Sequence, residues 1–184
     1  MKIDKKYFEE NGYLVLPNIV SKITLSKLNK NADQMISDFK KGINRRQSSN
    51  NNRKKHGDIS KNGKIFFGNQ CEYYPDINAY AKGKFVKKIV SKLLGNKIYL
   101  FNEQLVNKNP NTPSSFSWHQ DSGYIHFKHK PYVSIWLALT ETNEKNGALS
   151  IIPTNLKKTK NAKLHIWQNK SKDLGIKVNE KKAI

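Results

Sequence analysis

The sequence lacks the features that mark secreted and membrane-spanning proteins. Its 184 residues include one cysteine, Cys71, so no disulfide can form within the chain. No apolar run approaches the ~18–20 residues that a membrane-spanning helix needs. The opening stretch MKIDKKYFEENG carries acidic residues and no apolar core, so it does not predict a secretory signal. These absences favour a reducing compartment, and the cytoplasm is the expected location.

Arginine is also scarce. Of the 34 basic residues 31 are lysine, and the three arginines are Arg45, Arg46 and Arg53. A net charge of +20 is typical of proteins that bind polyanions, but a phosphate-binding surface is expected to be richer in arginine. Residues 98–156 hold four basic and four acidic residues, so the basic excess lies outside the middle of the chain. We expect scattered charge, and nucleic-acid binding stays open as an alternative.

Helical patterns come first along the chain and extended patterns follow. Apolar spacing and capping residues predict helices over 4–11, 21–41, 76–81 and 84–94. Branched and aromatic runs predict strands over 13–17, 64–67, 98–106, 118–121, 132–139 and 148–152. The polar, Asn- and Ser-rich residues 42–62 predict a mobile loop. The order indicates an α+β domain with a barrel or sandwich.

The sequence Trp118-His119-Gln120-Asp121 lies on one of these predicted strands. Residues i and i+2 of a strand point to the same face, so the imidazole of His119 and the carboxylate of Asp121 would lie side by side. Two histidines and one carboxylate on one face of Fe(II) form the site of non-heme iron oxygenases. Taken alone, however, a His-x-Asp pair is weak evidence for a metal site.

Several blocks around this pair resemble the phytanoyl-CoA dioxygenase family in their order. The resemblance covers about residues 4–156, apart from the 42–62 loop. The blocks are Phe8 to Pro17, Asn102 to Lys108, Trp118 to Asp121 with Tyr124, Val133 to Leu139, Asn146 to Leu149, and Ile152-Pro153. The resemblance implies a double-stranded β-helix, a jelly-roll of the cupin type, behind N-terminal helices. It also implies an enzyme that uses Fe(II), 2-oxoglutarate and O2 to hydroxylate a small organic substrate.

The resemblance further implies roles for single residues. Iron would be held by His119, Asp121 and a later histidine, and 2-oxoglutarate by a later arginine. Four residues match family positions around the cofactor: Trp136, Tyr124, Gln104 and Lys108. Ordinary packing is the alternative for Trp136 and Tyr124, and surface exposure is the alternative for Lys108.

The sequence departs from the family in its last part. Pro153-Thr154-Asn155-Leu156 stands where the family usually has Pro-Gly-Ser-His. No arginine follows Arg53, and lysine cannot provide the same bidentate fork. The histidines after Asp121 are His126, His129 and His165, of which His165 is the best spare candidate for a ligand.

We therefore expect a domain over residues 1–156 and a Lys-rich, divergent or truncated tail over residues 157–184. The chain would then be a truncated, split or decayed copy with an incomplete β-helix. With two protein ligands and no arginine, weak Fe(II) binding and little turnover are expected. The alternative to an oxygenase is a non-catalytic binding module that keeps the fold without a full iron site.

Overall fold

The computed structural model describes residues 2–41, 64–108, 115–125, 127, 129, 132–159, 161–171 and 173–184. The predicted mobile loop at 42–62 and His126 lie outside these residues. The described chain forms two compact units. The first contains residues 1–19, 89–97 and 116–184, and the second contains residues 20–88 and 98–115. Each unit has helical segments and one small antiparallel sheet, which agrees with the α+β expectation.

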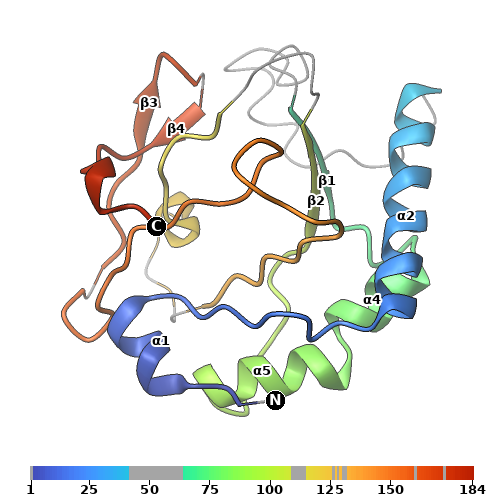
Figure 1. Cartoon of the computed structure of the whole chain (residues 1–184), viewed down its shortest axis with the longest axis horizontal. Helices are drawn as coiled ribbons and strands as arrows, with labels where there is room; N and C mark the ends of the chain where they lie inside the picture. The colour runs from blue at the N-terminus through green and yellow to red at the C-terminus, as the bar shows by residue number, and fades with distance from the viewer. Residues whose placement is uncertain are drawn as a thin grey trace. The chain divides into compact units, whose positions relative to one another are not determined.

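The second unit packs α2 (Lys22–Lys40) and α4 (Pro75–Ala81) with a two-stranded sheet. Strands β1 (Lys64–Gly68) and β2 (Gln104–Lys108) run antiparallel, and the pair is visible in Figure 1. Ser21 caps α2 by accepting the N–H of Thr24, as its position before the apolar pattern predicts. The apolar face of α2 buries Leu28, Ala32 and Met35.

Phe67 of β1 is fully buried in the core of this unit. Its ring makes an edge-to-face contact with Phe39 of α2, with the ring centroids 6.0 Å apart. Next to β1, the backbone N–H groups of Gln70 and Cys71 both donate to the carboxylate of Glu103. The sheet is thus held on one side by apolar packing and at one end by a charged acceptor.

The first unit begins with α1 (Lys5–Asn11), which Asp4 caps and which ends at Gly12 in the left-handed region, with φ +78°. The chain over residues 154–157 lies against the end of this helix. The N–H of Thr154 donates to the carbonyl of Asn11 at 2.8 Å. A Cβ on Gly12 would lie 2.7 Å from the carbonyl oxygen of Thr154, so the glycine permits this close approach.

The helix α5 (Lys84–Leu94) buries Ile89 and Leu93, and both residues belong to the first unit. The first unit also contains strands β3 (Ile166–Gln168) and β4 (Asp173–Gly175), which pair antiparallel, and a short 3-10 helix, η3 (Glu180–Lys182). The residues that the sequence predicted as a tail thus include a β-hairpin. Beyond η3, Ile184 exchanges two backbone hydrogen bonds with Ile151, both 2.9 Å long.

The predicted helices are confirmed, but most predicted strands are wrong. The stretches 13–17, 118–121, 132–139 and 148–152 contain no strand, and the stretch 98–106 overlaps β2 in its last three residues. The physical reason is that alternating apolar residues indicate extended backbone, whereas a strand also needs a hydrogen-bonded neighbour. The described chain therefore combines helices with small antiparallel sheets.

Candidate functional site

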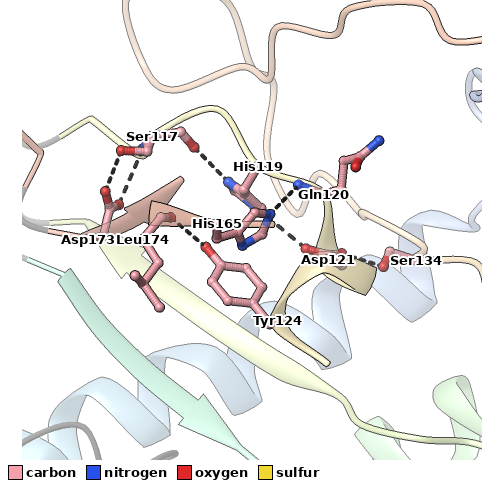
Figure 2. A network of polar contacts seen from close by, with 9 residues as sticks. All are labelled: Ser117, His119, Gln120, Asp121, Tyr124, Ser134, His165, Asp173 and Leu174. Carbon is pink, nitrogen blue, oxygen red and sulfur yellow. Dashed lines mark hydrogen bonds and ion pairs between the residues drawn. The ribbon is translucent and has the colours of Figure 1, made fainter. Parts of the chain in front are cut away.

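His119 and Asp121 lie next to each other in the first unit (Figure 2). The Nε2 of His119 is 3.5 Å from the Oδ1 of Asp121, and their side chains are 32% and 49% exposed. Gln120 between them is extended, with φ −119° and ψ 125°. An extended residue places its two neighbours on the same side of the chain, as the i, i+2 spacing predicts.

The predicted strand at this position is wrong. Asp121 begins the 3-10 helix η2 (Asp121–Tyr124), whose turn is closed by the N–H of Gly123 donating to the carbonyl of Gln120 at 2.8 Å. The extended backbone therefore stops at the second residue of the pair. The two side chains meet because one extended residue is sufficient to align them.

The orientation of the His119 ring is fixed by Ser117. The Nδ1–H of His119 donates to the backbone carbonyl of Ser117 at 2.7 Å. Ser117 is in turn held by Asp173 of β4, which accepts the backbone N–H at 3.2 Å and the hydroxyl at 2.5 Å. The result is a chain of contacts from β4 through Ser117 to the imidazole, which leaves Nε2 directed at Asp121.

Asp121 has a second partner from another part of the chain. The hydroxyl of Ser134 donates to its Oδ2, while Oδ1 faces His119. The two carboxylate oxygens therefore have separate partners. This arrangement fixes the plane of the carboxylate, because a carboxylate bound at both oxygens cannot rotate without losing one contact.

Each member of the pair favours the charged form of the other. The hydrogen bond to Asp121 raises the pKa of His119 above its ordinary value of 6.5, although burial opposes this shift. The hydrogen bond from His119 lowers the pKa of Asp121 below 3.8, again against the effect of burial, and Ser134 adds to the lowering. In the protein without a metal, the pair is an ion pair whenever the histidine is protonated.

Tyr124 closes one side of this group. Its ring centroid is 5.7 Å from that of His119 and 4.4 Å from that of His165, and its hydroxyl donates to the carbonyl of Leu174 at 3.0 Å. Burial raises the pKa of Tyr124, and the negative charges of Asp173 and Asp121 raise it further. The phenol thus stays protonated and remains a hydrogen-bond donor.

The other predicted site residues lie elsewhere on the chain. Trp136 is 52% exposed and follows Ser134 by two residues. Gln104 and Lys108 are the first and last residues of β2, in the second unit, and both belong to the exposed positions of that strand. Their roles toward a cofactor stay predictions. His129 donates through Nδ1 to the carbonyl of Phe127 at 2.9 Å.

Sequence reasoning missed the residues that support the pair. Asp173 and the backbone around Leu174 belonged to no motif, Ser134 lay in a family-like block but was given no role, and His165 was considered only as a spare ligand. These contacts join residues up to 56 positions apart, so no local pattern could reveal them. Gly123 and Gly175 are the sequence features that mark these close approaches, because a Cβ at either position would clash with a neighbouring segment.

Within the described ranges, no three His, Cys, Asp or Glu side chains are grouped so that they could hold a metal ion. Among the helices in the same part of the chain, none is long and apolar enough to cross a membrane.

Comparisons with known proteins agree with the sequence resemblance. The chain is 27% identical over 81 residues to a probable alpha-ketoglutarate-dependent hypophosphite dioxygenase of Stutzerimonas stutzeri, a match that covers 44% of this chain and 28% of the relative. It is 29% identical over 82 residues to a 2-aminoethylphosphonate dioxygenase of an uncultured bacterium, HF130_AEPn_1. This second match covers 44% of this chain and 31% of the relative. Each match spans less than a third of the relative's length.

No solved structure matches the chain significantly. The family model for phytanoyl-CoA dioxygenase (PhyH) matches residues 8–183. This match includes His119 and Asp121 and continues through β3 and β4 to η3. The chain belongs to the phytanoyl-CoA dioxygenase family.

Proposed function

We propose that this protein is an Fe(II)- and 2-oxoglutarate-dependent dioxygenase that hydroxylates a small organic substrate, with His119 and Asp121 as iron ligands. The observation that carries the proposal is the separation of 3.5 Å between His119 Nε2 and Asp121 Oδ1 in a member of this family. We further propose the double-stranded β-helix of the family as the fold of the domain.

The chemistry of the two donors fits ferrous iron, and the described residues supply two protein ligands without a third. A neutral imidazole nitrogen and a carboxylate oxygen are the ligand types of the 2-His-1-carboxylate site. Because Nδ1 of His119 carries the proton that it donates to Ser117, the lone pair of the neutral ring lies on Nε2, which faces Asp121. When bound, iron together with 2-oxoglutarate and O2 would supply the oxidising chemistry for hydroxylation of a C–H bond.

The chain's own residues would orient these ligands and line the site. Ser134 holds one oxygen of Asp121 and leaves the other toward His119. Tyr124, a protonated phenol beside His119, would contact the cofactor from one side. We assign a cofactor-binding role also to Trp136, on the strength of its family position.

The names of the two relatives suggest which substrates to test first. Both proteins are named for phosphorus compounds, hypophosphite and 2-aminoethylphosphonate.

The alternative is a non-catalytic binding module of the same family. His119 and Asp121 have hydrogen-bond partners of their own in Ser117 and Ser134, and they form an ion pair when the histidine is protonated, so the arrangement can persist for structural reasons without iron. Measurements of metal binding and of turnover distinguish the dioxygenase from the non-catalytic module.

The experiment is anaerobic titration of the purified chain with Fe(II), followed by succinate formation with 2-oxoglutarate, ascorbate, O2 and each candidate substrate. Loss of a residue that supports a metal ligand typically weakens metal binding by roughly 10–100-fold. Removal of a ligand itself should weaken Fe(II) binding by at least as much. His119→Ala tests this, and His129→Ala is the matched control, because His129 also donates through Nδ1 to the carbonyl two residues earlier.

Turnover that His119→Ala abolishes and His129→Ala leaves intact supports the dioxygenase. Fe(II) binding without succinate formation supports the non-catalytic module. A chain that binds no Fe(II), or binds it equally well after His119→Ala, contradicts the iron site.

A further inference from the structure

His165 lies at the centre of the network in Figure 2, immediately before β3. Its side chain is nearly inaccessible, with 6% of the residue exposed. The ring makes an edge-to-face contact with Tyr124, at 4.4 Å and 79° between the planes. It also lies 6.4 Å from the ring of His119 at 84°. The imidazole is therefore held in one orientation by its neighbours.

The Nε2 of His165 accepts the backbone N–H of Gln120 at 3.2 Å. This peptide group lies between the two proposed iron ligands. The backbone N–H of Lys163 donates to the side-chain Oε1 of Gln120 at 2.8 Å. The short segment from Lys163 to His165 thus holds Gln120 through both its backbone and its side chain.

Gly123 permits this close packing. A Cβ at Gly123 would collide with the Nε2 of His165 and would lie 2.8 Å from the carbonyl oxygen of Lys163. The first turn of η2 and the segment before β3 therefore touch at the same atom that accepts the Gln120 N–H. Only a residue without a Cβ lets the ring reach that peptide.

We propose that His165 is a positioning residue for the iron site: it fixes the Gln120 peptide, and so the relative orientation of His119 and Asp121, without binding the metal itself. The inference rests on the proposed function. The lone pair on its Nε2 is already used by Gln120. In addition, His165 does not form a metal-holding group with the pair among the described residues.

Two variants separate the hydrogen bond from the bulk of the side chain. His165→Leu fills the space but offers no acceptor, whereas His165→Gln places an amide oxygen at about the reach of Nε2. His165→Leu should weaken Fe(II) binding by roughly 10–100-fold, as loss of a supporting residue does in other metal sites, and His165→Gln should restore most of it. Leu164→Ala is the control, because the neighbouring Leu164 is 73% exposed.

Hydrogen exchange of the Gln120 amide reports on the contact in the metal-free protein. The amide should be protected in the parent and in His165→Gln, and exchange faster in His165→Leu. Pulsed EPR of the Cu(II)-loaded protein counts coordinated imidazoles, and we expect the same number in the parent and in His165→Leu.

Loss of one coordinated imidazole in His165→Leu would make His165 a ligand and overturn the inference. Fe(II) binding as tight as that of the parent, or no gain from His165→Gln over His165→Leu, would also overturn it. A parent chain that binds no metal would overturn the proposed function instead, and the His165 contact would then be decided by the Gln120 exchange rates alone.

Discussion

The Nδ1–H of His119 donates to the backbone carbonyl of Ser117, 2.7 Å away. A carbonyl oxygen only accepts, so this contact places the proton of the neutral imidazole on Nδ1 and the lone pair on Nε2. Ser117 owes its own position to Asp173, which accepts both its N–H and its hydroxyl. Through Ser117, Asp173 of β4 thus determines that Nε2 is the nitrogen of His119 that can bind a metal ion.

We expect Asp173→Ala to destabilise the protein and to weaken metal binding. Ser117 would lose two hydrogen bonds to a charged acceptor, each of which typically contributes about 1.5–3 kcal/mol. Fe(II) affinity should fall by roughly 10-fold, because the His119 ring loses its support. Chemical denaturation and Fe(II) titration measure the two effects.

Asp173→Asn is the matched variant for this prediction, because its amide oxygen keeps one acceptor for Ser117. Its effects should be smaller than those of Asp173→Ala. Equal effects of the two variants would contradict a role through the two hydrogen bonds.

The His119–Asp121 pair should make the stability of the metal-free protein depend on pH. The pKa of His119 is raised, so its contribution is full below 6.5 and is lost as pH rises through the folded pKa. The pKa of Asp121 is lowered, so its contribution is full above 3.8 and is lost as pH falls through the folded pKa. The pair therefore stabilises most between about pH 4 and 6.5.

Asp121→Asn tests this dependence. The pKa of His119, followed by NMR of its ring protons, should fall in this variant, because the hydrogen bond that His119 donates to Asp121 is the main cause of its rise. The loss of stability should be larger at pH 5.5 than at pH 9, where the histidine is neutral. Asp33→Asn, at an exposed position of α2, is the control. A His119 pKa that does not change in Asp121→Asn would refute the pairing.

The helices could be predicted from the sequence because their signals are local. Ser21 and Gly12 cap helix ends within a few residues of the apolar patterns that they bound. The i, i+2 spacing of His119 and Asp121 is equally local, and it places the two side chains together even though the strand is absent.

The support of the site depends on contacts that have no local signal. Gln120 and His165 are 45 positions apart, and Ser117 and Asp173 are 56 apart. Hydrogen bonds of this kind are set by how the β3–β4 hairpin packs, which the composition of a Lys-rich segment does not indicate. Most of the predicted strands were wrong for a similar reason, because pairing depends on a distant partner, whereas the prediction over 64–67 is confirmed as β1.

Phe67→Ala should destabilise the second unit strongly. Phe67 is fully buried, and its ring contacts Phe39. Removing a buried phenylalanine side chain typically costs about 3–5 kcal/mol, because the cavity is only partly refilled. Thermal or chemical unfolding measures this loss, and Phe127→Ala, at a site that is 70% exposed, is the control. A loss no larger than that of the control would show that Phe67 is not part of a packed core.

Gly123→Ala should disturb the site without removing any of its functional groups. The new Cβ would collide with the Nε2 of His165 and press on the carbonyl of Lys163. We expect a loss of about 1–3 kcal/mol, the usual cost of overpacking. We also expect faster hydrogen exchange at Gln120, because the ring must move away from the N–H that it accepts.

Ser122→Ala is the matched control, since it places alanine at the neighbouring position of η2. Denaturation midpoints and amide exchange rates of both variants give the comparison. If Gly123→Ala costs stability but leaves the Gln120 amide as protected as in the parent, the strain is relieved at Lys163. In that case the contact between Gly123 and His165 does not control the peptide between His119 and Asp121. The alternative outcome is that Gly123→Ala, and not Ser122→Ala, loses stability, protection of the Gln120 amide and Fe(II) affinity together. This result would show that a backbone position without functional groups controls the geometry of the His119–Asp121 pair.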